Sequence, residues 1–159
     1  SDPPFSAYLN YLVKYVSDSH PGAQEKGLEV LSVYIEHQPD MVASQTDQIS
    51  KAIVEKGLAS AKTTIKQQAQ TILLDLFGIN KNSEAFIEGL KSALGNRNVK
   101  IQAAALYAIN TLMNAYGIMK VPFKPFVDVV EKYAGAALQP AGLQEIFHCA
   151  MQDEWYTQL

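Results

Sequence analysis

The side chains that could perform acid–base, nucleophilic or metal chemistry are few and scattered. The three histidines, His20, His37 and His148, lie far apart in the chain, and none has a second ligand at metal-site spacing. Cys149 follows His148 directly, so on a helix the two side chains would not share a face, which disfavours a catalytic cysteine–histidine pair. The chain also has no glycine-rich phosphate loop. We therefore expect no catalytic residues, no metal site and no cofactor.

Basic side chains in turns offer a different chemistry, the attraction of an acidic partner. Lys62 and Lys66 lie at one polar turn, and Arg97, the only arginine of the chain, lies with Lys100 at another. If these turns lie side by side, the four charges gather along one edge and speed encounter with an acidic surface. The alternative is that they are ordinary solvated turn residues, because most turns are polar. On the residues alone, both interpretations stay open.

Length and composition predict a single folded domain around these residues. The chain has 159 residues, of which 48% are hydrophobic and 18% charged, enough for a sizeable core. Its formal net charge of −3 is unlike that of strongly basic nucleic-acid-binding proteins. The single cysteine excludes an internal disulfide and is typical of a reducing compartment. No apolar run reaches the ~20 residues of a membrane span. We expect neither nucleic acid nor membrane as a partner.

The spacing of apolar residues predicts helices throughout, and no segment alternates with the period of a strand. In the helix that follows Asn98, Ala105 and Ala108 fall on an apolar face that we expect to be buried, and Gly117 stands at the C-cap position. Acidic residues such as Glu25 are interpreted as a solvated face. The expected helices cover about residues 5–16, 23–36, 42–58, 64–77, 83–94, 99–116, 121–134 and 143–156.

Three helix starts can be superposed, which predicts an internal repeat. They begin at Ala23, Ile65 and Ile101, 42 and 36 residues apart, and each reaches a small residue four positions later. A small side chain there would let two helices approach closely. A period near 40 residues with two helices per unit is the signature of HEAT repeats. The sequence therefore predicts an all-α solenoid of stacked HEAT-type antiparallel helix pairs; the alternative is an irregular helical bundle with chance periodicity.

With the three turns located, the sequence resembles a TOG domain, and most closely the first TOG domain of the XMAP215 family of microtubule polymerases. Four segments within about residues 8–130 carry the resemblance through their order and spacing. They are Ser17-Asp18-Ser19 with Gln24-Glu25-Lys26-Gly27-Leu28; Ser60-Ala61-Lys62-Thr63-Thr64-Ile65-Lys66; Asn96-Arg97-Asn98-Val99-Lys100-Ile101; and Tyr116-Gly117 with Lys120 and Lys124-Pro125. Asp153-Glu154-Trp155 resembles the acidic close of the domain, so we expect residues 1–159 to form one such domain.

This resemblance implies a partner, a location and a site. TOG domains are paddles of stacked repeats whose intra-repeat turns line one edge and bind curved, unpolymerised αβ-tubulin. The chain is thus expected to be a non-enzymatic module that regulates microtubule growth, at microtubule plus ends, the spindle or the centrosome in the cytoplasm. The residues implied in tubulin binding are Ser17, Asp18, Ser19, His20, Lys26, Lys62, Thr63, Lys66, Asn96, Arg97 and Lys100.

Two departures from the family pattern qualify this expectation. The family's first repeat carries a tryptophan that packs on tubulin, whereas the only tryptophan here is Trp155, so the first repeat is expected to be absent or truncated. The segment 135–140, which corresponds to the usually basic fifth turn, carries no charge. The chain starts without a methionine, and we expect a monomeric domain within a larger multidomain protein.

Two other functions remain as alternatives. A generic HEAT scaffold would bind another protein, such as a peptide, on its concave face and would carry basic residues on the second helix of each pair. A helical enzyme domain would use Cys149 or a histidine within a concave pocket of groups with perturbed pKa values.

Overall fold

The computed structural model describes residues 5–117, 119–122 and 124–133, and this part of the chain contains helices and no strand. The expected turn at 135–142 and the expected helix at 143–156 lie outside the described residues, as do His148, Cys149 and Trp155. In chain order the helices are α1 (Phe5–Val16), α2 (Pro21–His37), α3 (Pro39–Ala43), α4 (Thr46–Ala52), the π-helical segment η1 (Ile53–Leu58), α5 (Thr63–Ile79), α6 (Ser83–Leu94), α7 (Val99–Tyr116) and α8 (Lys124–Tyr133).

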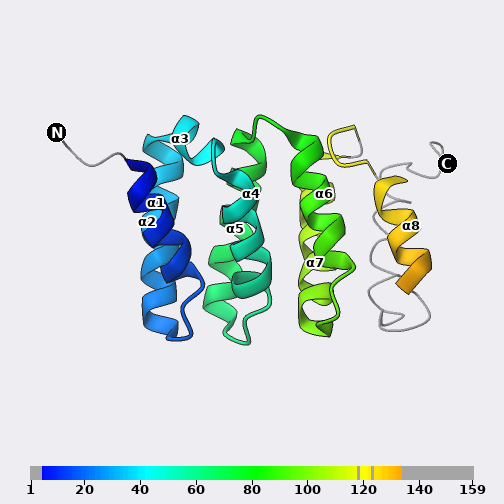
Figure 1. The fold of residues 1–159 in the computed structure, drawn as a ribbon, viewed down its shortest axis with the longest axis horizontal. Helices are drawn as coiled ribbons and strands as arrows, with labels where there is room; N and C mark the ends of the chain where they lie inside the picture. Colours follow the sequence, from blue (N-terminus) through cyan, green and yellow to red (C-terminus); the bar gives the residue numbers. More distant parts are fainter. Residues whose placement is uncertain (1–4, 118, 123, 134–159) are drawn as a thin grey trace.

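The helices form antiparallel pairs that stack in single file (Figure 1). The pairs are α1 with α2, α4–η1 with α5, and α6 with α7. The first helices make one layer, in which α4 packs on α6 and α6 on α8. The second helices make the other layer, in which α2 packs on α5 and α5 on α7. The predicted all-α solenoid of stacked helix pairs is therefore confirmed for the described residues.

The prediction of one continuous helix over residues 42–58 is wrong. The chain instead forms the short helix α3, breaks at Ser44 and Gln45, and restarts as α4. Side chains compete with the helical backbone at this break, since the Ser44 hydroxyl donates to the Met41 carbonyl (2.6 Å) and the Thr46 hydroxyl to the Ala43 carbonyl (2.9 Å). The break lies at the end of the stack opposite to the turns within the pairs (Figure 1).

Small residues allow the helices of a pair to approach closely, as the repeat predicted. The corresponding positions Gly27, Ala69 and Ala105 are all buried. A Cβ atom on Gly27 would lie 2.8 Å from Cβ of Tyr15 in α1, and one on Gly57 would lie 2.6 Å from Cβ of Ala69 in α5. Both distances are too short for carbon atoms, so the first and the second pair each have a contact that only glycine permits.

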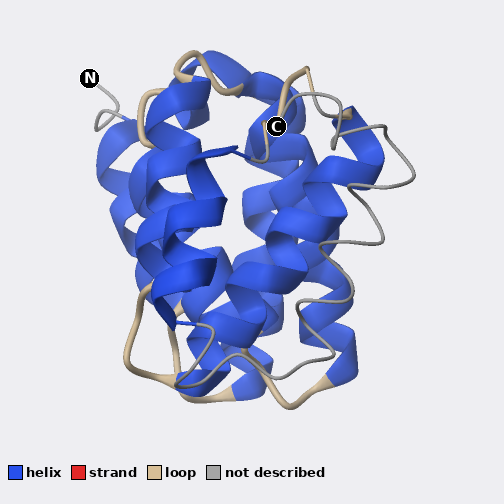
Figure 2. Ribbon diagram, turned by 90° about the vertical axis from the view of Figure 1, so that its right-hand side faces the viewer, coloured by secondary structure: helices blue, strands red, loops and turns tan. Residues whose placement is uncertain are grey.

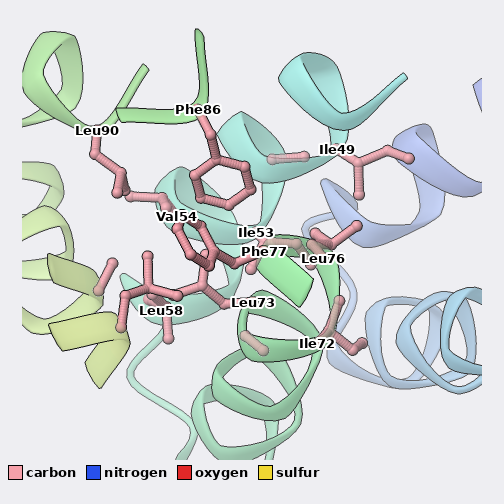
Figure 3. Packing of buried hydrophobic residues seen from close by; sticks show 14 of the residues in the cluster. Ile49, Ile53, Val54, Leu58, Ile72, Leu73, Leu76, Phe77, Phe86 and Leu90 are labelled. Carbon is pink, nitrogen blue, oxygen red and sulfur yellow. The ribbon is translucent and has the colours of Figure 1, made fainter. Parts of the chain in front are cut away.

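The core runs continuously along the stack and holds successive pairs in register (Figure 3). Between the second and third pairs, the ring of Phe77 in α5 meets the ring of Phe86 in α6 edge-on, with centroids 5.2 Å apart and planes at 87°. Tyr116 closes the same cluster: its ring lies 4.9 Å from that of Phe77, and its hydroxyl donates to the Leu74 carbonyl (2.7 Å). In α7, Ala105 and Ala108 are fully buried as predicted. This packing fixes where the turns within the pairs lie relative to one another.

Candidate tubulin-binding edge

Three turns join the helices within the pairs, and all three lie at the same end of the stack (Figures 1 and 2). They comprise residues 17–20, 59–62 and 95–98, so each is four residues long. We call these turns, with residues 21–26, 63–66 and 99–100 of the helices that follow them, the turn edge. The repeat predicted from the sequence thus places its three helix starts on corresponding faces.

The three turns share one local geometry. The N-cap residues that open α2, α5 and α7 are all extended, with φ/ψ of −87°/115°, −85°/118° and −78°/115°. In each turn the side-chain oxygen two residues before the N-cap accepts the N-cap backbone N–H. These bonds join His20 N to Asp18 Oδ1 (2.7 Å), Lys62 N to Ser60 Oγ (3.1 Å) and Asn98 N to Asn96 Oδ1 (2.8 Å). Such side-chain turns order the backbone at the entry to each helix.

Every residue that the sequence singled out for binding lies on this edge. Ser17 and Asn96 are partly buried and the other nine side chains are exposed. A side-chain oxygen of Asp18 and of Asn96 accepts a hydrogen bond within its own turn. His20 Nδ1 accepts the Ala23 N–H at 3.4 Å. These three residues therefore also have structural roles. The edge holds Ser17, Asp18, Ser19 and His20 in the first turn, Lys26 on α2, Lys62, Thr63 and Lys66 at the start of α5, Asn96 and Arg97 in the third turn, and Lys100 on α7.

The cations of the edge differ in whether an internal carboxylate holds them. Lys26 pairs with Glu29 at 2.8 Å, and Lys62 pairs with Glu25 at 2.7 Å. By contrast, no carboxylate of the described residues lies within ion-pairing distance of Lys66, Arg97 or Lys100. The positive charge available to a partner is therefore concentrated at the start of α5, in the third turn and at the start of α7.

The helices that begin at the turn edge add to its positive potential. A helix N-terminus carries a partial positive charge that acidic residues usually offset. The first turns of α2, α5 and α7 contain no acidic residue. At the opposite end of the stack, α4 and α6 begin with Asp47 and Glu84 in their first turns. Helix ends without an acidic first-turn residue and basic side chains thus coincide at one edge of a chain whose net charge is −3.

Glu25 is the residue of this edge that sequence reasoning missed. Its carboxylate accepts hydrogen bonds from Lys62 and from the Thr64 hydroxyl (2.9 Å), and these bonds, that of Lys62 first, lower the pKa of Glu25 below its ordinary value. Both partners belong to the next helix pair, 37 and 39 residues further along the chain. No local pattern reveals such a contact, and only the superposition of repeats could have suggested it.

The described residues offer little for catalysis. They contain no group of three or more histidine, cysteine or acidic residues that could hold a metal ion. A groove of about 440 Å³ between α2, α5 and α7 is lined by Asp75 and Tyr116, whose pKa values are both raised, chiefly by burial. The Tyr116 hydroxyl, however, is bound to the Leu74 carbonyl, and no histidine or cysteine lines the groove. Among the described helices, none is long and apolar enough to cross a membrane.

The comparisons with known proteins agree with this geometry. The chain is 29% identical over 125 residues to the protein mini spindles of Drosophila melanogaster, which covers 79% of this chain and 6% of that protein. It is 30% identical over 125 residues to centrosomal protein 224 of Dictyostelium discoideum, which covers 78% of this chain and 6% of that protein. The family model described as "XMAP215/Dis1/CLASP, TOG domain" matches residues 1–138. The chain therefore belongs to the TOG-domain family of XMAP215, Dis1 and CLASP proteins.

Proposed function

We propose that this chain binds curved, unpolymerised αβ-tubulin through the turn edge and thereby regulates microtubule growth, without catalysing a reaction. The observation that carries the proposal is the alignment of three geometrically equivalent turns in a chain of the TOG family, with Lys66, Arg97 and Lys100 exposed and unpaired among the described residues. A basic edge on an acidic domain suits an acidic partner and steers the partner toward that edge.

The distribution of basic residues favours this function over a peptide scaffold. A scaffold that captures an acidic peptide along the second helices would need cations along those helices. In α2, α5 and α7, the lysines are Lys26, Lys66 and Lys100, all within the first two turns and next to the edge. The remainder of each second helix contains no lysine or arginine.

The names of the two relatives suggest where the chain acts. One name refers to spindles and the other to the centrosome. We propose that this chain likewise acts on cytoplasmic microtubules of the spindle or spindle pole, as one domain of a larger protein. The matched proteins are much longer than the 125 residues that align, which cover 6% of each.

The proposal is tested by co-elution with unpolymerised αβ-tubulin on gel filtration, at low salt and micromolar protein. Arg97→Ala with Lys100→Ala should abolish or strongly reduce co-elution, because Arg97 can grip a carboxylate with two hydrogen bonds and Lys100 adds a second charge. Both side chains are exposed, so the fold should survive. The matched control is Lys51→Ala with Lys124→Ala, which removes two exposed lysines of α4 and α8 that lie outside the turn edge and have no carboxylate partner among the described residues. Equal binding by the two double variants would contradict the proposal.

A further inference from the structure

One carboxylate of the turn edge links the first helix pair to the second. Glu25 Oε1, on α2, accepts hydrogen bonds from Lys62 Nζ (2.7 Å) and from Thr64 Oγ1 (2.9 Å), at the start of α5. The Lys62 side chain is 47% exposed and that of Glu25 is 29% exposed, so this contact lies at the surface. A partner that reached the turn edge would meet Lys62 already engaged.

Because of this contact, the cations in one part of the turn edge are paired with carboxylates and those in the other part are free to bind a partner. Toward the first turn, Lys26 is paired with Glu29 and Lys62 with Glu25. Toward the third turn, Lys66, Arg97 and Lys100 have no carboxylate partner among the described residues. An acidic surface would therefore be attracted first to the part of the edge formed by the start of α5, the third turn and the start of α7.

We propose that Glu25 is an internal competitor that limits how tightly the turn edge binds its acidic partner, by withholding Lys62. The partner docks on Lys66, Arg97 and Lys100, and Lys62 joins the interface only when it exchanges the carboxylate of Glu25 for one on the partner. Exposed ion pairs contribute little to stability, so the exchange is close to balanced and Glu25 tunes the affinity instead of blocking binding. This inference rests on the proposed function, in which the partner is tubulin.

The test is a double-mutant cycle on tubulin binding. Glu25→Gln removes the charge but keeps an amide oxygen that can still accept the Thr64 hydroxyl, so the local fold is retained. We expect this variant to bind unpolymerised αβ-tubulin about two- to fivefold more tightly at low salt, mainly through slower dissociation, because Lys62 joins the interface after the partner has docked. The gain should disappear when Glu25→Gln is made in the Lys62→Ala background, because the two residues then no longer interact. The control Glu36→Gln removes the same charge from the far end of α2 and should bind like the wild type.

Each outcome bears on the inference. If Glu25→Gln binds no more tightly than Glu36→Gln, Glu25 does not limit the affinity. If the gain persists without Lys62, Glu25 acts by general repulsion and the withholding of Lys62 is refuted. If the wild type does not bind tubulin, the proposed function fails instead, and the same cycle with poly-glutamate as probe tests whether Glu25 withholds Lys62 from carboxylates.

Discussion

The side chain of Glu25 has a role on the turn edge that arises only when neighbouring helix pairs stack. Glu25 lies on a helix with other acidic residues, and nothing in the local pattern distinguishes it from Glu29. Its partners, Lys62 and Thr64, come from the next pair of helices. They can meet Glu25 only because α2 packs on α5 with the two helix starts side by side. At this scale, the affinity of the edge depends on a contact between repeats and not within one.

The pKa of Glu25 provides a direct measurement of this contact. The hydrogen bonds from Lys62 and Thr64 hold the pKa below the ordinary value of 4.5, so we expect Lys62→Ala to raise it toward that value. Because the folded-state pKa is depressed, the stability that Glu25 contributes is present above the unfolded-state pKa and is lost as the pH falls through the folded-state value. Titration of the Glu25 carboxyl carbon by NMR, in the wild type and Lys62→Ala, measures the difference. An unchanged pKa would mean that Lys62 does not hold the carboxylate in solution.

At the scale of the helices, most boundaries could be predicted because apolar spacing and turn formers agree. Asn98 accepts the Lys100 N–H as an N-cap, and Gly117 ends α7 with φ 76°. The break at Ser44 and Gln45 could not be predicted, because the apolar residues on either side continue the helical spacing. There, short-range bonds from hydroxyls to backbone carbonyls outweigh the helical pattern.

The glycines of η1 and α6 give a matched pair of predictions on packing. Gly57→Ala should destabilise the fold by about 1–3 kcal/mol, because its Cβ would overlap Cβ of Ala69, which is anchored to a backbone. Gly89→Ala should instead stabilise it by about 0.5–1 kcal/mol, because Gly89 is exposed in mid-helix and its Cβ would meet nothing within 4 Å. Urea unfolding of both variants measures the two effects. A stabilised Gly57→Ala would show that the second helix pair is less tightly packed than described.

At the scale of the whole molecule, charge is distributed unequally between the two ends of the stack. Lysines and an arginine surround the helix starts on the turn edge, whereas Asp47 and Glu84 occupy helix starts at the opposite end. Cations at a helix N-terminus oppose its dipole, so this arrangement costs stability. The sequence alone located the basic residues of the candidate edge, because the repeat predicted which turns align, but it missed Glu25. It could not tell that Lys62 is paired, since this pairing depends on how neighbouring repeats stack.

Lys100→Glu should change stability and tubulin binding in opposite directions. It replaces a cation with an anion in the first turn of α7 and should raise the free energy of unfolding by about 0.3–1 kcal/mol. The same change removes positive charge from the candidate edge and should weaken tubulin binding at low salt. Chemical denaturation and gel filtration with tubulin measure the two quantities on one sample. Binding equal to that of the wild type would show that Lys100 is not a contact residue.

Because the helix pairs stack in single file, the middle pair sets the distance between the first and third turns. Packing passes from α2 to α5 and from α5 to α7, so the first and third turns are spaced through two junctions that share α5. A small rotation of α5 against its neighbours would shift both neighbouring turns. It would thereby change the distance between the first and third turns, which a partner has to match. Loss of binding would then arise from substitutions deep inside the protein, at residues such as Phe77 that no partner ever touches. A screen for binding defects should therefore recover buried positions of α5 as well as the exposed cations.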